Sequence, residues 1–189
     1  SVAIKLPLPP GCLQGIWKNP ERFHAGYLAT YDGYYLSGDG GYLDDDGYLY
    51  IMGRTDDVIN VAGHRLSTGE MEEIVSAHPD VAECAVVGVA DELKGQVPMA
   101  LIVLKNGVNT PEEQVFEQIR LEVRQQIGAL ACLKKIHRVE RLPKTRSGKI
   151  LRRLIRQMVD GEDYKVPSTI DDVDIIAEIS NVLKLVASF

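Results

Sequence analysis

The spacing of hydrophobic residues changes partway along the chain, between residues 53 and 65. Residues 1–53 contain short alternating apolar segments separated by turns, which predict β structure. They include a hairpin over residues 42–52, with Asp46-Gly47 in the turn. We expect two units, with the boundary at Arg54–Asp57.

The stretch that joins the two predicted units has a strand and a turn of its own. Val58–Val61 predicts a short strand, and Ala62-Gly63 predicts a tight turn where the backbone can approach a ligand. The stretch is either a surface connector with an exposed turn or a hinge whose far end carries an anion-binding loop.

The rest of the chain has an alternating pattern of strands and amphipathic helices. The predicted order after the hinge is βαββαβα, followed by a polar loop and a last helix. Thr68 is expected to cap the first helix, and Thr110-Pro111 begins the second with proline in its first turn. The expected elements are a helix from Thr68 to His78, strands over 81–89, 97–104 and 136–142, a helix from 110 to 127, a helix after the loop 143–148, and a helix over 173–186. The pattern predicts an α+β protein whose second unit is a small mixed α/β domain, a central sheet flanked by helices.

Composition restricts the class of protein. The 189 residues are 45% hydrophobic and 25% charged, as in ordinary globular domains. No run approaches 18 apolar residues, and the first residues lack the basic region of a signal peptide, so no membrane association is expected. The chain opens within a strand pattern, Val2–Leu6, and we expect it to be part of something longer.

Cysteine usage indicates a reducing compartment. Cys12, Cys84 and Cys132 are odd in number, far apart and not arranged as Cys-x-x-Cys. This favours free thiols over a disulfide framework or a zinc site. We expect a cytoplasmic protein, or one of the mitochondrial matrix if it is eukaryotic. Cys84, inside an apolar strand, is expected to be a buried thiol.

Basic residues are concentrated in one segment of an otherwise acidic chain. The net charge is −6, yet residues 134–156 contain ten Lys or Arg and a single acidic residue, Glu140. Such a segment suits a compact anionic ligand better than a duplex backbone, so no nucleic acid partner is expected. The alternative is a solvated basic helix face.

Lys149, which follows the loop Pro143–Gly148, stands at a position where helix stability does not favour a lysine. We expect Lys149 in the first turn of a helix, where the helix dipole disfavours a cation by a few tenths of a kcal/mol. The residue therefore makes sense if its ammonium must reach a phosphate or carboxylate. The chain contains no G-x-x-x-x-G-K-[ST] pattern, so this is not a Walker A loop.

Several segments resemble, in order and spacing, the C-terminal motifs of AMP-forming acyl-CoA synthetases. They are Ser37-Gly38-Asp39, Tyr48–Asp57, Asn60–Leu66 and Pro143–Lys149. His64-Arg65-Leu66 resembles the short-chain acetyl/propionyl branch, and Lys94–Pro98 and Ser168–Asp172 lean toward propionyl-CoA synthetases. The resemblance implies that residues 1–53 end a large N-terminal domain and that residues 58–189 form a mobile C-terminal domain.

The resemblance assigns roles in adenylation. Asp39 would accept hydrogen bonds from the ATP ribose, and Arg54 would reach the same ribose. Asp56 would be the hinge residue, and Lys149 would be catalytic, holding the acyl carboxylate and the α-phosphate. Lysine acetylation and deacetylation of Lys149 would switch the enzyme. The alternatives are that Asp39 is a simple turn residue, that Arg54 pairs with Asp56 or Asp57, and that Lys149 is a solvated lysine.

The resemblance also assigns roles in transfer to coenzyme A. Gly63 would let the backbone pass beside the pantetheine arm, and Arg65 and Arg124 would meet phosphates, Arg65 serving AMP as well. Ala62 stands where acetyl-CoA synthetases usually have serine, which removes one hydroxyl contact. For Arg124, an exposed arginine on a helix without a ligand role is nearly as good an interpretation as a phosphate contact.

The implied ligands are ATP or AMP, coenzyme A, Mg²⁺ and a small carboxylic acid. A further cation site at the end of the first small-domain helix would use Ser76, His78 and Val81, although a histidine before Pro79 more often simply ends a helix. The upstream large domain would be the partner, and the chain alone would be inactive. The alternatives are a non-catalytic binding or regulatory module and an adenylating enzyme that transfers to a carrier-protein thiol.

Overall fold

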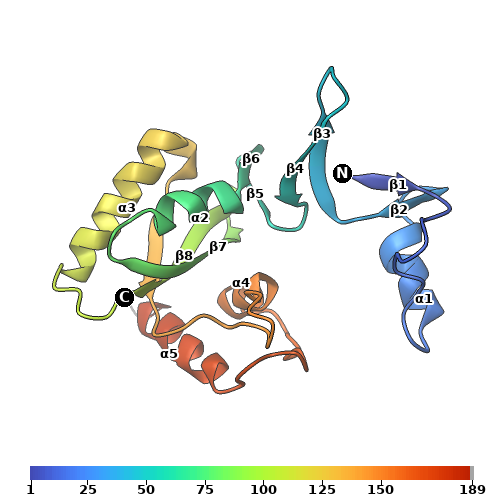
Figure 1. Ribbon diagram of the computed structural model, residues 1–189. Coiled ribbons are helices and arrows are strands. Elements are labelled where there is room, and N and C mark those ends of the chain that lie inside the picture. Colours follow the sequence, from blue (N-terminus) through green and yellow to red (C-terminus); the bar gives the residue numbers. More distant parts are fainter. Residues whose placement is uncertain (188–189) are drawn as a thin grey trace. The chain divides into compact units, whose positions relative to one another are not determined.

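The computed structural model describes residues 1–187, apart from the side chains of Met52 and of residues 185–187. Contacts within the chain divide it into two compact units, Ser1–Asp56 and Asp57–Phe189. Figure 1 shows the elements of each unit. No helix of the described chain is long and apolar enough to cross a bilayer.

The first unit consists of two small antiparallel sheets and a short helical segment. β1 (Ala3–Lys5) pairs with β2 (Tyr34–Leu36), and β3 (Asp39–Leu43) pairs with β4 (Leu49–Arg54). The β3–β4 turn is closed by Asp44, whose carboxylate accepts the backbone N–H groups of Asp46 and Tyr48. This confirms the hairpin predicted over residues 42–52.

A helical segment in the first unit was not predicted. α1 (Pro20–Phe23) continues into the π-helix η1 (His24–Leu28). Asn19 caps it by accepting the N–H of Arg22, and Pro20 occupies the first helical position. The interpretation of residues 1–53 as β structure with turns is therefore wrong for this segment, which is too short to have an apolar stripe.

The second unit is built on a five-stranded sheet. The strand order is β6 (His64–Ser67), β5 (Val58–Val61), β8 (Gly95–Leu104) and β7 (Val81–Asp91), and β9 (Lys135–Arg138) pairs in parallel with the far half of β8. All other pairs are antiparallel. β7 and β8 alternate side chains between two buried faces, which explains their continuous apolar sequences.

Helices cover both faces of this sheet (Figure 1). α2 (Thr68–Ser76) and α3 (Glu112–Gln126) enclose one core cluster, which includes Val86 and Ile102. α4 (Arg152–Asp160) and α5 (Ile175–Ala187) enclose a second, which includes Val87 and Leu101. The short 3-10 helix η2 (Ala129–Ala131) follows α3. The predicted mixed α/β fold with a helix-flanked sheet is confirmed.

Several predicted boundaries require correction. Ser67, rather than Thr68, caps α2, because its hydroxyl accepts the N–H of Glu70. His64–Ser67 forms an additional strand across the Ala62-Gly63 turn. Pro111 is the N-cap residue of α3 and not its first-turn residue. The strand predicted over 136–142 ends at Arg138, because the chain then turns away from β8.

Candidate functional site

Three predicted site residues lie together at the end of the β3–β4 ladder in the first unit. Asp39 and Arg54 face each other across the two strands, with an Nη1–Oδ1 distance of 3.7 Å. Arg54 Nε also donates to Asp56 Oδ1 at 3.0 Å, and its Nη1 donates to the carbonyl of Ser37 at 3.1 Å. The pairing of Arg54 with Asp56, which was the alternative to a ribose contact, is thus present in the structure.

Gly38 is required where this guanidinium lies. Its φ is +82°, and a Cβ at this position would come within 2.7 Å of Arg54 Nη2. The carbonyl of Gly38 also accepts both the N–H and the hydroxyl of Thr55. The Ser37-Gly38-Asp39 turn thus fixes the guanidinium beside a half-exposed carboxylate, which is an arrangement able to bind vicinal hydroxyls through acceptor and donor groups.

Gly63 and Arg65 lie on the β5–β6 hairpin of the second unit. Ala62 (φ +50°) and Gly63 (φ +85°) form a two-residue turn that needs positive φ at both positions. The space beside Gly63 is open, and Arg65 is exposed. The turn is fastened by the N–H of Ala62, which donates to the carbonyl of Lys94 at 2.8 Å. The turn is therefore anchored at its base and has open space beside Gly63.

Lys149 lies in a small hairpin that is closed around Thr145. Thr145 N–H donates to the carbonyl of Lys149 at 2.9 Å, and Lys149 N–H donates to Thr145 Oγ1 at 3.1 Å. Gly148 N–H donates to the carbonyl of Thr145, and Lys144 bridges to Ile150. The backbone of Lys149 is therefore fixed, whereas its side chain is exposed and makes no ion pair with a described residue.

The prediction that Lys149 occupies the first turn of a helix is wrong. α4 begins at Arg152, and its N-cap is Leu151, whose N–H donates to the carbonyl of Pro143. The hairpin uses the residues that the pattern had assigned to the helix start. The helix dipole therefore gives no reason for a cation at this position, and exposure on a rigid turn is the feature that remains.

A salt bridge that the sequence did not reveal fixes the start of α4. Arg152 donates from Nε and Nη2 to both carboxylate oxygens of Glu72, at 2.9 and 2.6 Å. Glu72 Oε1 also accepts the N–H of Val86 on β7. The pair is mostly buried, and its hydrogen bonds raise the pKa of Arg152. This bidentate pair joins α2, β7 and α4 three residues after Lys149.

Arg124 and the predicted cation site show no convergence. Arg124 is exposed on α3 and takes part in none of the ion pairs among described residues. Ser76 Oγ is 3.2 Å from Cys84 Sγ, and both ring nitrogens of His78 contact protein groups: Gln118 Oε1 and the N–H of Asp80. Within residues 1–187, no group of three His, Cys, Asp or Glu side chains could hold a metal.

Two titratable side chains lie in apolar surroundings. Cys84 is buried, as predicted, and burial raises the pKa of its thiol to about 11. Burial also lowers the pKa of His137, which pairs across to Leu101 on the parallel β8–β9 ladder. The Cys84 thiol is 3.2 Å from the hydroxyl of Ser76, one of the residues of the predicted cation site.

The structure thus groups the predicted residues by unit. Asp39, Arg54 and Asp56 form one cluster in the first unit. In the second unit, no hydrogen bond among the described side chains links Lys149 to Gly63, Arg65 or Arg124. The role of Thr145 was missed, although a threonine four residues before the lysine is a spacing at which its hydroxyl can reach the lysine N–H.

Comparisons with known proteins agree with these motifs. Residues 70–149 match the family model of the AMP-binding enzyme C-terminal domain. The chain is 54% identical over 184 residues to the mouse mitochondrial acyl-CoA synthetase short-chain family member 3, covering 97% of this chain and 27% of that protein. It is 46% identical over 177 residues to acetyl-coenzyme A synthetase of Pyrobaculum arsenaticum, covering 94% and 26%. The chain thus spans less than a third of these relatives.

Solved structures of larger enzymes share the fold over about three quarters of this chain. ATP-bound MatB from Rhodopseudomonas palustris superposes with a TM-score of 0.64 and 28% identity, covering 78% of this chain and 28% of that one. The amide bond synthetase McbA from Marinactinospora thermotolerans gives a TM-score of 0.62 and 32% identity, covering 76% and 28%. Residues 70–149 thus match an AMP-binding enzyme C-terminal domain, and nearly the whole chain is similar to the C-terminal portion of short-chain acyl-CoA and acetyl-CoA synthetases.

Proposed function

We propose that this chain is the C-terminal part of an ATP-dependent ligase that joins a short carboxylic acid, acetate or propionate, to coenzyme A. The carboxylate would react with ATP to give an acyl-adenylate and pyrophosphate, and the thiol of coenzyme A would then displace AMP. The observation that carries the proposal is the similarity to short-chain acyl-CoA and acetyl-CoA synthetases over 94–97% of this chain.

Lys149 is the proposed catalytic residue of adenylation. Negative charge accumulates on the α-phosphate and the attacking carboxylate oxygen, and an ammonium group held beside them stabilises that charge. The fixed backbone of the Thr145 hairpin and the exposed side chain support this role, because the charge is presented from a rigid base. Acetylation of Lys149 would remove the charge and stop the reaction.

The cluster in the first unit is proposed to bind the nucleotide ribose. Asp39 supplies acceptors for the two hydroxyls, and Arg54 supplies donors from the adjacent strand. Asp56, bonded to Arg54, is the proposed hinge residue. Among the described residues no group of three His, Cys, Asp or Glu side chains could hold a metal ion, and no step is assigned to Mg²⁺ here.

The β5–β6 turn is proposed to act in the second half-reaction. Gly63 leaves open space along the backbone for the pantetheine arm, and Arg65 is exposed two residues further on for a phosphate of AMP or coenzyme A. Arg124, exposed on α3, is proposed as a second phosphate contact.

The test replaces Lys149 in the longer protein. Lys149→Ala should lower the rate of acyl-adenylate formation, measured by pyrophosphate exchange, by about 10²- to 10³-fold, because one transition-state charge contact is lost. Thioester formation from added acyl-adenylate and coenzyme A should stay within about twofold of the wild type. Arg146→Ala is the matched control, since it removes an exposed cation from the same loop.

The outcomes separate the alternatives. Undiminished adenylation in Lys149→Ala contradicts the catalytic assignment. Adenylation with transfer only to a carrier-protein thiol favours the sister activity. Absence of adenylation in the wild-type longer protein favours a binding or regulatory module. The 189 residues alone should form no acyl-CoA, because the acyl pocket is proposed to lie upstream.

A further inference from the structure

The hairpin that carries Lys149 is extended by a third segment from the C-terminal part of the chain. Thr145 bridges antiparallel to Ile170. On either side of this bridge, Arg146 N–H donates to the carbonyl of Thr169 at 3.1 Å, and Asp171 N–H donates to the carbonyl of Lys144 at 2.9 Å. Residues 167–179, called here the C-terminal strap, therefore pair with the first arm of the hairpin, whose second arm contains Lys149.

Apolar residues anchor the strap to the second face of the sheet. Ile170, Ile175 and Ile179 are each no more than 4% exposed. They belong to the core cluster that includes Leu101 of β8 and Leu142 of the segment leading to the hairpin. Burial of three isoleucine side chains is worth several kcal/mol, so the strap is bound as firmly as a core element.

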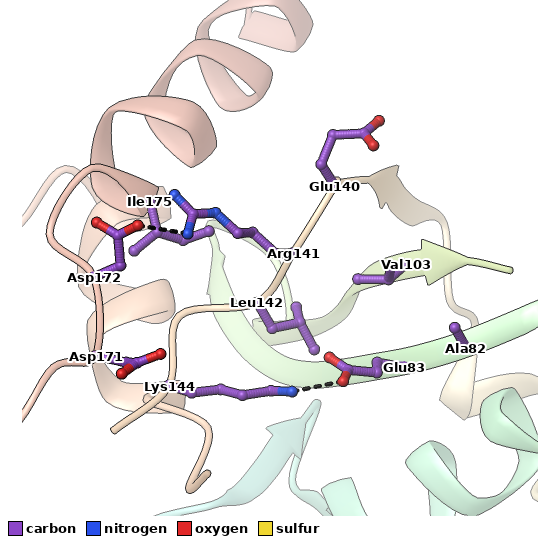
Figure 2. A pocket seen from close by; sticks show the side chains of 10 residues that line it. All are labelled: Ala82, Glu83, Val103, Glu140, Arg141, Leu142, Lys144, Asp171, Asp172 and Ile175. Carbon is purple, nitrogen blue, oxygen red and sulfur yellow. Dashed lines mark hydrogen bonds and ion pairs between the residues drawn. The ribbon is translucent and has the colours of Figure 1, made fainter. Parts of the chain in front are cut away.

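Ion pairs anchor the strap at its surface (Figure 2). Arg141 donates to Asp172 Oδ2 at 2.6 Å and to both carboxylate oxygens of Glu178, at 2.6 and 3.0 Å. Lys144 Nζ donates to Glu83 on β7 at 2.6 Å. Arg141, Asp172, Lys144 and Glu83 line a cavity of about 290 Å³ between the strap and β7. Both basic side chains that line this cavity, Arg141 and Lys144, form ion pairs within the protein. These ion pairs hold the hairpin in place, and the cavity has no unpaired cation for an anionic ligand.

We propose that the C-terminal strap is a positioning element for Lys149. The inference rests on the proposed function, and it assigns a role to residues beyond the matched family domain, which ends at residue 149. The strap fixes Lys144 and Arg146, which flank Thr145, and Thr145 holds the backbone of Lys149 through its N–H and its hydroxyl. The ammonium thus acts from a three-segment ribbon whose outer edge is the strap.

A positioning role has a kinetic consequence. A displacement of about 1 Å at a reacting group can lower a rate by about 10²-fold. Loosening the strap should therefore lower kcat of adenylation while KM for ATP stays unchanged, because the proposed ribose contacts lie in the other unit. It should also leave transfer from preformed acyl-adenylate unchanged.

The test removes a single backbone donor in the longer protein. Asp171→Pro deletes the N–H that donates to Lys144, whereas Asp171→Ala keeps it and is the matched control. Asp171→Pro should lower kcat for pyrophosphate exchange by about 10- to 10²-fold. KM for ATP and thioester formation should stay within about twofold of the wild type, and Asp171→Ala should match the wild type throughout.

Two other causes of a lower rate are tested separately: unfolding of the variant, and failure of the proposed function itself. If Asp171→Pro lowers the melting temperature below the assay range, Arg141→Gln replaces it, because this change releases the ionic anchor and leaves the ribbon backbone intact. If Lys149→Ala impairs adenylation and neither folded strap variant does, the strap is not a positioning element. Normal adenylation in Lys149→Ala overturns the proposed function itself. Equal losses in adenylation and thioester formation in the strap variants indicate a general structural role and also overturn the inference.

Discussion

The two units of the chain differ in how their candidate functional residues are supported. In the second unit, two clusters of buried side chains lie on the two faces of one sheet, and the hairpin that carries Lys149 is joined to that sheet by the ion pair of Lys144 with Glu83. In the first unit, no residue whose side chain is described is buried. Asp39 and Arg54 lie there on a two-stranded ladder, with further hydrogen bonds from the N–H of Val2 to the carbonyl of Asp39 and from Arg54 to the carbonyl of Ser37.

The first unit nevertheless has many large apolar side chains. Those on the β3–β4 hairpin are between 47% and 67% exposed: Tyr42, Leu43, Tyr48, Leu49, Tyr50 and Ile51. Two-stranded hairpins are marginally stable in water, and exposed apolar patches of this kind mark surfaces that another segment covers. The difference teaches that the second unit supplies its own core, whereas the first presents the candidate ribose-binding residues on a scaffold in which no described side chain is buried.

Separating the units should produce the largest effect. Residues 57–189 expressed alone should fold cooperatively, because both core clusters lie within them. Residues 1–56 alone should give the circular dichroism of an unfolded chain. Hydrogen exchange should show slow amides in β7 and β8 and fast amides in β1–β4. A cooperative thermal transition in isolated 1–56 would remove the basis of the comparison.

A matched pair of isoleucines should give the next largest effect. Ile102 is fully buried on β8, whereas Ile51 is 55% exposed on β4. In urea denaturation of the 189-residue chain, Ile102→Ala should lower the free energy of unfolding by roughly 2–5 kcal/mol. Ile51→Ala should change it by about 0.5 kcal/mol or less. Similar losses at both positions would mean that the first unit has a core equivalent to that of the second.

Local patterns in the sequence were sufficient for much of the fold. The continuous apolar segments predicted β7 and β8, and the helical stripes predicted α2, α3, α4 and α5, because burial sets these periods directly. The resemblance of the motifs indicated the same kind of relatives that the comparisons find. Neither source predicted α1, which depends on one capping asparagine and one proline and not on a repeated pattern.

Contacts between distant residues could not be predicted from the sequence. Glu72 and Arg152 are 80 positions apart, and Arg141 lies 37 positions before Glu178. No local spacing encodes such pairs. The same limit explains the error at Lys149: the apolar stripe continues through Ile150 and Leu151, but the backbone pairing of Lys144 with Ile150 ends the hairpin there and delays the helix.

The smallest expected effect is the pH dependence of the stability that the ion pairs of Arg141 give to the strap. It tests how much these charges contribute to the stability of the second unit. Hydrogen bonds from Arg141 lower the pKa of Asp172 and of Glu178 below their ordinary values of 3.8 and 4.5. A carboxyl group with a lowered pKa in the folded state stabilises that state above its unfolded pKa, and this contribution is lost as the pH falls through the folded value.

We therefore expect wild type and Arg141→Gln to differ in urea midpoint at pH 7 and to converge as the pH falls below about 4. The difference should be small, because all three side chains are more than 40% exposed and the ion pairs are screened by solvent. High salt at pH 7 should reduce it further. A difference that stays constant from pH 7 to acid would show that Arg141 stabilises the strap through packing of its methylene groups, and the charges would then contribute nothing to closing the second face of the sheet.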